Sequence, residues 1–323
     1  MKTIISSIAL ALTIGIGTIS PPVHGHSAAS AHSVSKQAPG YYRWTLGDFT
    51  ITALSDGTFD LPVDQLLHGP KPGEVAAAFK RAFAKLPMEM SVNAFLIDTG
   101  SKLILIDAGG GKWYGPALGR VRESLIAAGY QPEQVNLVLL THLHGDHSGG
   151  LLVDGKRAFP NAKVRAPKAD FDYYLDPANR KAATDLEKVN FAAAETVSAA
   201  YRAAGRLAPF IGATEIAPGV RALPAPGHSP SHAVYMAESK GETLMLVGDL
   251  LHVPQIQFAH PEDSMAFDFD ESEADTSRKT FLKEAAAHRY WIAGAHLPFP
   301  GIGHVRPESS GYVYVPAEYT ANR

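Results

Sequence analysis

Cysteine is absent from the 323 residues of this sequence. Its absence excludes disulfide bonds, thiolate metal ligands and a cysteine nucleophile. A metal site in this chain must therefore be built from imidazole and carboxylate groups. The folded chain must gain its stability from its core and from bound groups, without covalent cross-links.

An excess of positive charge is also missing, because 29 Lys and Arg are opposed by 32 Asp and Glu, for a net charge of −3. No run of Lys or Arg is longer than two residues. Binding to nucleic acid requires a basic surface, and the sequence indicates none. We expect no nucleic-acid partner, and we disfavour polyanionic substrates.

An apolar run long enough to span a membrane is lacking. The run at 4–19 is short for a span and is interrupted by Ser, Thr and Gly. Lys2 precedes it and Pro21-Pro22-Val23-His24-Gly25 follows it, a pattern typical of a secretory signal peptide rather than a membrane anchor. We predict a signal peptide at 1–25 and a flexible Ala-, Ser- and His-rich leader at 26–39. The cleavage position stays open, and the mature protein should be periplasmic or secreted without stable membrane insertion.

The rest of the chain, 40–323, is predicted to be one domain, since no linker rich in Pro, Ser or charge divides it. Strands are expected at 49–54, 93–98, 103–107, 135–140, 162–166, 220–224, 233–238, 243–247, 290–295 and 312–315. Helices are expected at 74–86, 116–128, 170–175, 181–204 and 273–288. Two groups of strands with accompanying helices indicate an α/β (α+β) fold with two packed mixed sheets and helices outside.

Two short segments were interpreted from their turn residues. Ser55-Asp56-Gly57 is expected to form a turn after the first strand. Ala108-Gly109-Gly110-Gly111 lacks the Lys-Ser/Thr of a phosphate loop and the spacing of a dinucleotide fingerprint. We therefore interpret it as a flexible edge of the active site.

Three imidazoles and one carboxylate are concentrated in segment 141–147, which reads THLHGDH and follows the predicted strand 135–140. Alternate side chains of an extended segment share a face, so His142 and His144 should project together. The next three residues, Gly-Asp-His, can turn at the glycine and direct Asp146 and the third imidazole to the same place. Solvated loop histidines are the alternative, but three of 14 His in so short a window favour two divalent metal ions.

Three later segments also deliver a metal-binding side chain at the end of a strand or in a turn. These are His228 after the turn Pro226-Gly227, Asp249 after the apolar run 244–248, and His296 after the run 291–295. A carboxylate has one oxygen for each of two cations, so Asp249 is the natural bridge between them. His232 is interpreted as a supporting or packing residue.

This pattern, HxHxDH with the later His, Asp and His, resembles the metallo-β-lactamase superfamily of hydrolases. The resemblance implies an αββα sandwich of two mixed sheets flanked by helices. It implies one metal on His142, His144 and His228, a second on Asp146, His147 and His296, and Asp249 as the bridge. Zn²⁺ is the expected ion, and Asp146 and Asp249 are the candidate catalytic residues.

Four stretches resemble a narrower group, the methyl parathion hydrolases. They are PGYYR at 39–43, AGYQPEQV at 128–135, GDLLHV at 248–253 and GAHLPFPGIGH at 294–304. Members of that group are exported dinuclear zinc hydrolases, commonly homodimers, that cleave organophosphate triesters and in several cases lactones or esters. The resemblance therefore implies a metal-dependent hydrolase of a small uncharged ester, lactone or phosphotriester, and a homodimer.

Alternative functions were weighed against the same residues. A glyoxalase-II-like thioesterase shares the motif, but only 27 residues (323 − 296) follow His296. An acyl-homoserine lactonase without phosphotriesterase activity stays open. The sequence has no cysteine ligand for a β-lactamase of the cysteine type and no basic surface or extra arm for an RNA-processing nuclease. An iron redox protein of this fold would need a flavin domain, which would lengthen the chain. A binding protein with a degenerate site should have lost a ligand, and none is lost.

The substrate pocket is expected to be apolar and lined by aromatic residues near the motifs. The candidates are Trp113, Tyr114, Tyr173, Tyr174, Phe191, Phe267 or Phe269, together with His252, which follows the predicted bridge by three residues. Each aromatic residue could instead belong to the core, and His252 could lie in a surface loop. The native substrate and the ion at each site stay open.

Overall fold

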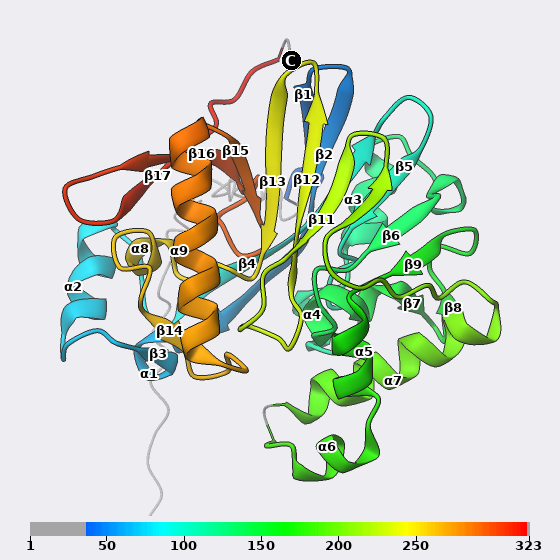
Figure 1. Ribbon diagram of the computed structural model, residues 1–323, viewed down its shortest axis with the longest axis horizontal. Coiled ribbons are helices and arrows are strands. Elements are labelled where there is room, and N and C mark those ends of the chain that lie inside the picture. The colour runs from blue at the N-terminus through cyan, green and yellow to red at the C-terminus, as the bar shows by residue number, and fades with distance from the viewer. Residues whose placement is uncertain (1–36, 186, 322–323) are drawn as a thin grey trace, which may run out of the picture. The chain divides into compact units, whose positions relative to one another are not determined.

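The structure is a computed structural model that describes residues 37–185 and 187–321 (Figure 1). The predicted signal peptide and most of the predicted leader lie outside the described residues, so both stay predictions. From Ala38 onward the chain forms one compact unit.

A six-stranded mixed sheet forms the first half of this unit. Its order is β1 (Tyr41–Leu46), β2 (Phe49–Leu61), β4 (Met88–Asp98), β5 (Leu103–Ile106), β6 (Leu137–Leu139) and β9 (Lys163–Arg165). The first four strands are antiparallel, whereas β5, β6 and β9 run parallel. The carboxyl ends of these three parallel strands therefore lie at the same edge of the sheet. The predicted metal motif begins there, directly after β6.

A seven-stranded mixed sheet forms the second half. Its order is β10 (Thr214–Ala217), β11 (Val220–Pro224), β12 (Ala233–Ser239), β13 (Glu242–Gly248), β15 (Trp291–Gly294), β16 (Ile302–Pro307) and β17 (Tyr312–Pro316). Only β13 and β15 pair in parallel. Because parallel neighbours share their carboxyl edge, the residues that follow β13 and β15 come out side by side.

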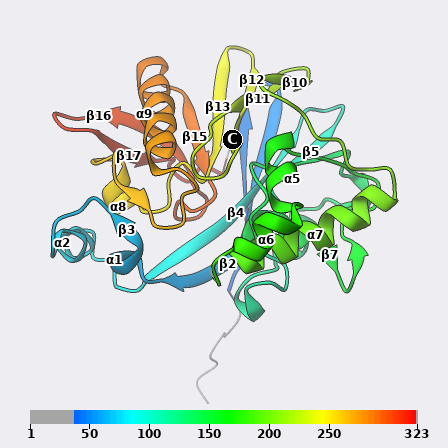
Figure 2. The ribbon, with the colours of Figure 1, turned by 60° about the horizontal axis from the view of Figure 1, so that its bottom comes forward.

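Helices cover the outer face of each sheet (Figures 1 and 2). Helices α3 (Val121–Ala127), α5 (Lys168–Tyr174) and α7 (Lys188–Ala203) pack on the six-stranded sheet, and α9 (Glu271–His288) packs on the seven-stranded sheet. The other helices of the described residues are α1 (Val63–Leu66), α2 (Glu74–Arg81), α4 (Gly145–Ser148), α6 (Pro177–Ala182) and α8 (Pro254–Gln257). Short 3₁₀ turns occupy Gly115–Ala117, Pro132–Gln134 and Gly149–Leu151. Two small strand pairs join β3 (Leu67–His68) to β14 (Ser264–Met265) and β7 (Leu152–Val153) to β8 (Lys156–Arg157). No helix within 37–185 and 187–321 combines the length and the apolar character needed to cross a membrane.

Alternation along the strands assigns their side chains to three core layers. Ile97 packs between the two sheets, whereas its neighbour Leu96 packs under α3, α5 and α7. Leu246 likewise faces the other sheet, and Met245 faces α9. Successive residues of a strand point to opposite faces, so strands buried on both sides are apolar throughout. The expected order of helix, sheet, sheet and helix is confirmed.

Two turn interpretations were wrong. Residues 55–57 do not end the strand, because β2 continues to Leu61 through a bulge opposite β4. Segment 108–111 is not a flexible edge, since Ala108, Gly109 and Gly110 are buried. A Cβ on Gly150 would lie 1.8 Å from the Ala108 carbonyl oxygen, so this backbone packs directly on the segment after the metal motif.

Several helix boundaries also differ from the prediction. Helix α2 ends at Arg81, five residues before the expected end at 86, and Phe83 beyond it has φ of 54° and is 98% exposed. The expected helix at 181–204 is two helices, α6 and α7, separated before Lys188. Alanine-rich composition favours a helix at every position, so it did not reveal this interruption. Strands β1, β10, β14 and β16 were not predicted.

Candidate metal centre

The motif residues occupy the loop and short helix that follow the carboxyl end of β6. His142 and His144 lie in the loop, and Asp146 and His147 lie in α4, which begins at Gly145. All four are at least nine-tenths buried. The local sequence thus brings its own imidazoles and carboxylate together, as the spacing predicted.

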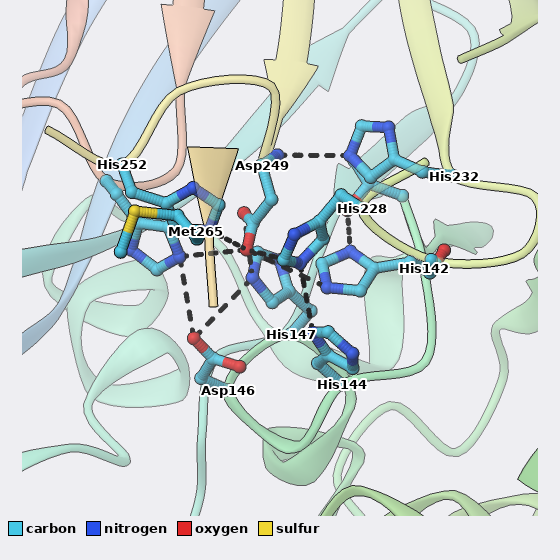
Figure 3. A network of polar contacts seen from close by, with 12 residues as sticks. His142, His144, Asp146, His147, His228, His232, Asp249, His252 and Met265 are labelled. Carbon is cyan, nitrogen blue, oxygen red and sulfur yellow. Dashed lines mark hydrogen bonds and ion pairs between the residues drawn. The ribbon is translucent and has the colours of Figure 1, made fainter. Parts of the chain in front are cut away.

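The three later residues reach the same place from the seven-stranded sheet, as Figure 3 shows for His228 and Asp249 and as the contact of His296 with Asp249 shows for the third. His228 comes from the connection between β11 and β12, Asp249 directly follows β13, and His296 follows β15. The structure therefore brings together all seven side chains for which the sequence predicted a metal role. They form two groups, His142, His144, His228 and Asp249, and Asp146, His147, Asp249 and His296.

The distances between the donor atoms of the first group match those between the ligands of a single metal ion. The Nε2 atom of His228 lies 3.0 Å from Nδ1 of His144 and 3.2 Å from Oδ2 of Asp249. Nε2 of His142 lies 3.7 Å from the same oxygen. Donor atoms around a tetrahedral zinc ion with bonds of about 2.0–2.1 Å are about 3.3 Å apart. The first group can therefore hold a divalent ion with little movement.

The second group is similarly spaced and uses the same carboxylate. Nε2 of His147 is 3.0 Å from Oδ1 of Asp249 and 3.6 Å from Oδ2 of Asp146. Nε2 of His296 is 3.1 Å from Oδ2 of Asp249 and 3.5 Å from Oδ2 of Asp146. The carboxylate of Asp249 is thus shared by both groups.

Each of the five histidine rings has its second nitrogen held by a partner outside the two groups. These pairs are His142 Nδ1 with Thr141 Oγ1 (3.0 Å), His144 Nε2 with the Tyr174 hydroxyl (2.7 Å), His147 Nδ1 with Asp107 Oδ2 (2.9 Å), His228 Nδ1 with Asp268 Oδ1 (2.8 Å) and His296 Nδ1 with the Ser91 carbonyl oxygen (2.9 Å). Such partners set the orientation and the tautomer of a ring that binds a metal. The rings are therefore arranged with one nitrogen anchored and the other directed inwards.

Three of the inward atoms are buried and make no hydrogen bond: Nε2 of His142, Nε2 of His147 and Oδ1 of Asp249, the last two meeting only in their 3.0 Å ion-pair contact. Leaving buried polar atoms unpaired is costly, and native proteins rarely do so without a reason. Neutral imidazole and carboxylate are what divalent cations such as zinc accept. The donor set therefore fits two divalent ions.

The electrostatics of the protein favour the ligand forms of His142, His144 and Asp249, whereas Asp249 and the neighbouring carboxylates raise the pKa of His147, His228 and His296 against the effect of burial. A bound cation offsets the field of those carboxylates. Burial, with the neighbouring histidines, holds the pKa of His142 and of His144 well below the usual value, so both rings stay neutral. Burial alone would raise the pKa of Asp249, but His147 and His296 hold it well below the usual range. A neutral imidazole and an ionised carboxylate are the forms that bind a cation.

A cavity opens above the two groups and is lined mainly by apolar side chains. Its walls are Phe59, Leu61, Met90, Val189, Phe267 and Phe269, with Tyr114, Tyr174, Glu187, Asn190 and His252 as polar groups. His144, Asp146, His228, Asp249 and His296 form its floor. Within the part of the chain that the structure describes, the lining includes no Lys or Arg.

The predicted pocket residues divide between this cavity and the core. Tyr114, Tyr174 and His252 line it, and Nε2 of His252 lies 3.1 Å from Oδ2 of Asp249. Phe191 does not, because it is wholly buried behind Tyr174 with a ring-centroid distance of 5.1 Å. Trp113 does not either, since it packs beside Gly149, where a Cβ would meet its ring at 2.5 Å.

Several supporting residues were not predicted. Asp107 ends the apolar strand β5 as Asp249 follows β13, and that shared pattern could have revealed it. Its carboxylate accepts from the Thr141 backbone N–H at 2.8 Å and holds His147. Asn93 donates to the carbonyl oxygens of Gly294 (3.2 Å) and Leu297 (2.7 Å), on both sides of His296, and no local pattern indicates it.

The model of the metallo-beta-lactamase superfamily matches residues 88–296. Among curated proteins, the chain is 32% identical over 160 residues to an atrochrysone carboxyl ACP thioesterase of Passalora fulva, covering 49% of this chain and 38% of that protein. It is 27% identical over 165 residues to an N-acyl homoserine lactonase of Bacillus cereus, covering 51% and 56%. The matched part is thus less than two thirds of either relative.

Solved structures match over nearly the whole described chain. The hydrolase AbOPH of the beta lactamase superfamily superposes with a TM-score of 0.83 at 35% identity, covering 88% of this chain and all of that one. AidC, described as a dizinc quorum-quenching lactonase and bound to N-hexanoyl-L-homoserine as a product, gives 0.80 at 28% identity, covering 87% and 98%. The fold expected from the sequence is confirmed by these matches.

Proposed function

The chain belongs to the metallo-beta-lactamase superfamily, and we propose that it is a dinuclear zinc-dependent hydrolase of small uncharged esters and lactones. One observation carries the proposal. Two four-residue groups share Asp249, and five of their seven residues form the floor of a cavity whose walls are mainly apolar.

The roles of the residues follow from their positions. His142, His144 and His228 would hold one ion, Asp146, His147 and His296 the other, and Asp249 both. Two such ions supply an acidified water and polarise the oxygen of a scissile carbonyl or phosphoryl group. We assign Asp146 and Asp249 as catalytic residues because both carboxylates line the cavity, where they can accept a proton next to the scissile bond.

The cavity walls support the choice of substrate. Apolar rings and aliphatic side chains bind an acyl chain or an aromatic leaving group and exclude water. With no Lys or Arg in the described lining, and with Glu187 at the wall, the apolar wall offers no permanent cation to an anionic substrate. Lactones, aryl esters and phosphotriesters such as methyl parathion meet these conditions.

An acyl-homoserine lactonase without phosphotriesterase activity is the second candidate. It is supported by the similarity to AidC and to the Bacillus cereus lactonase. A thioesterase is supported by the Passalora fulva relative, which the chain covers over a shorter part.

The proposal is tested with purified protein whose metal content is counted. Turnover is measured for one acyl-homoserine lactone, dihydrocoumarin, an aryl acetate and methyl parathion. We expect hydrolysis of at least one lactone or aryl ester, lost after chelation and restored by Zn²⁺. Protein with two metals per chain that leaves every compound intact would overturn the function, and methyl parathion alone intact would favour the second candidate.

We also propose export and a homodimer, which rest on the sequence and its resemblance. Cell fractionation with the complete chain would detect the mature protein in the periplasm or medium. Size-exclusion chromatography with light scattering would measure the assembly state. A cytosolic protein, or a monomer at micromolar concentration, would contradict the respective proposal.

A further inference from the structure

Arg278 is a fully buried charged side chain that lies outside both metal groups. It belongs to α9, which packs on the outer face of the seven-stranded sheet, and its exposed fraction is 0%. A buried guanidinium is tolerated only when its donors are satisfied. Its partners should therefore show why α9 keeps an arginine in a buried position.

The hydrogen-bond and ion-pair partners of Arg278 in the described chain all lie in segment 250–268, between the two metal-binding strands. Its Nε donates to the carbonyl oxygen of Leu250, and Nη1 donates to those of Pro261 (2.8 Å) and Asp263 (2.9 Å). Nη2 lies 3.6 Å from Oδ2 of Asp268. A planar fork of several donors can hold such a set of acceptors, whereas a lysine ammonium cannot.

Asp268 connects this arginine to the first metal group. Its Oδ1 lies 2.8 Å from Nδ1 of His228, and its Oδ2 accepts from the Met265 backbone N–H at 2.9 Å. The side chain of Asp268 is 0% exposed. The orientation of the His228 ring therefore depends on the carboxylate of Asp268, which in turn is held by the buried guanidinium of Arg278.

The second connection runs through the backbone beside the shared carboxylate. Leu250 directly follows Asp249, and its carbonyl oxygen is bound by Arg278. Nε2 of His232 accepts from the Asp249 backbone N–H at 3.0 Å, so the bridge residue is held on both sides. Through these contacts the arginine acts on His228 and Asp249 together.

We infer that Arg278 and Asp268 are positioning residues for the metal centre, and that they act chiefly on the ion held by His142, His144 and His228. The inference rests on the proposed dinuclear centre. His147 and His296 are held by Asp107 and by the Ser91 carbonyl oxygen, and among the described residues Arg278 makes no hydrogen bond or ion pair with either support. Loss of the arginine should therefore weaken the two ions unequally.

The test measures metal affinity directly, without relying on activity. Arg278→Met, Arg278→Lys and Asp268→Asn are compared with wild type in competition titrations of Zn²⁺ against a chromophoric chelator. Supports of this kind typically contribute 10- to 100-fold in affinity. We expect one of the two ions to bind at least about 10-fold more weakly in each variant, while the other ion stays within about 3-fold of wild type.

A matched control separates positioning from stability. Leu282→Ala lies on the same helix, in the core between α9 and the sheet, and Leu282 is 3% exposed. This variant should lower the melting temperature as much as Arg278→Lys does, with both zinc affinities unchanged. Visible spectra of the Co²⁺-loaded proteins should change for Arg278→Lys and Asp268→Asn and not for Leu282→Ala.

Each outcome decides the inference. Wild-type affinity for both ions in Arg278→Lys and Asp268→Asn, or equal weakening of both ions, would overturn it while the proposed function stands. Should Arg278→Met fail to fold, the other two variants carry the same decision, because Asp268→Asn preserves the shape of the side chain. Wild-type protein that binds fewer than two ions would instead contradict the proposed function.

Discussion

The carboxylate of Asp249 has Nε2 of His147 next to one oxygen and Nε2 of His228 and His296 next to the other. Removing it by Asp249→Ala leaves each group with three donors and no shared ligand. We expect a folded protein that holds markedly fewer than two metals per chain by elemental analysis. Asp172→Ala, an exposed carboxylate on α5, is the control. Two metals per chain in Asp249→Ala would contradict the bridging role.

Glu187 is the carboxylate of the cavity wall that is not part of the metal groups. Its Oε2 accepts from the backbone N–H and the hydroxyl of Thr184, and glutamine can keep an acceptor there. We expect Glu187→Gln to raise kcat/KM for an anionic ester, 4-nitrophenyl hydrogen glutarate, about fivefold relative to neutral 4-nitrophenyl butyrate. A repulsion on the order of 1 kcal/mol corresponds to that factor.

The control for this selectivity is Glu195→Gln, on the helix α7 that Glu187 directly precedes but outside the cavity. It should leave the ratio of the two kcat/KM values at the wild-type value. An unchanged ratio in Glu187→Gln would show that the wall carboxylate does not select against anions.

At the scale of elements, the bulge in β2 places Asp56 under the backbone of segment 108–111. Its oxygens accept from the backbone N–H of Gly110 (2.8 Å) and of Val121 (3.0 Å), and the residue is fully buried. Asp56→Ala leaves two buried donors unpaired, each costing about 1–3 kcal/mol. We expect a loss of about 2–4 kcal/mol in the free energy of unfolding, measured by denaturant titration of the metal-loaded protein.

Asp60→Ala provides the comparison for that measurement, because Asp60 lies on the same strand and is exposed. Surface substitutions of this kind usually stay within about 0.5 kcal/mol of wild type. Equal free energies of unfolding of Asp56→Ala and Asp60→Ala would mean that Asp56, in the bulge of β2, does not stabilise segment 108–111.

Elements with a clear apolar period were predictable, and elements defined by their neighbours were not. The predicted strand 220–224 coincides with β11, and the predicted strand 233–238 differs from β12 by one residue. The turn expected at 55–57 failed because Ser, Asp and Gly are turn residues locally, whereas here the bulge and a buried acceptor determine the conformation. The helix expected at 74–86 was predicted too long, because α2 ends at Arg81 and a helical period of apolar residues does not reveal where a helix ends.

At the scale of the molecule, the metal centre joins the two sheets, since its ligands come from both. Ions that bind only the native state stabilise it in proportion to the logarithm of their concentration over Kd. We expect removal of zinc by a chelator to lower the melting temperature by roughly 10 °C or more, as a change of several kcal/mol does for a chain of this size. Differential scanning calorimetry before and after Zn²⁺ is restored checks this prediction.

Asp249→Ala serves as the comparison here as well. Because Asp249→Ala has fewer bound ions to lose, chelation should lower its melting temperature by less than it lowers that of wild type. A melting temperature that is the same with and without metal in wild type would show that the centre is not a link between the sheets.

The sequence by itself determined which chemistry is possible. Without cysteine only imidazole and carboxylate ligands are available, and the spacing of His142, His144, Asp146 and His147 brings four of them together within one turn and one short helix. Local geometry is sufficient for that step, because the backbone conformation of a short segment sets the directions of its side chains.

Only the tertiary structure decided which distant groups complete and support the centre. Asp249 and His296 meet the motif because β13 and β15 are parallel neighbours in the sheet facing β6, and His228 reaches it from the connection between β11 and β12. Asp268 and Arg278 reach His228 and the backbone after Asp249 through packing of α9 on that sheet. Contacts between residues far apart in the chain depend on how whole layers pack, and no local period of the sequence encodes that packing.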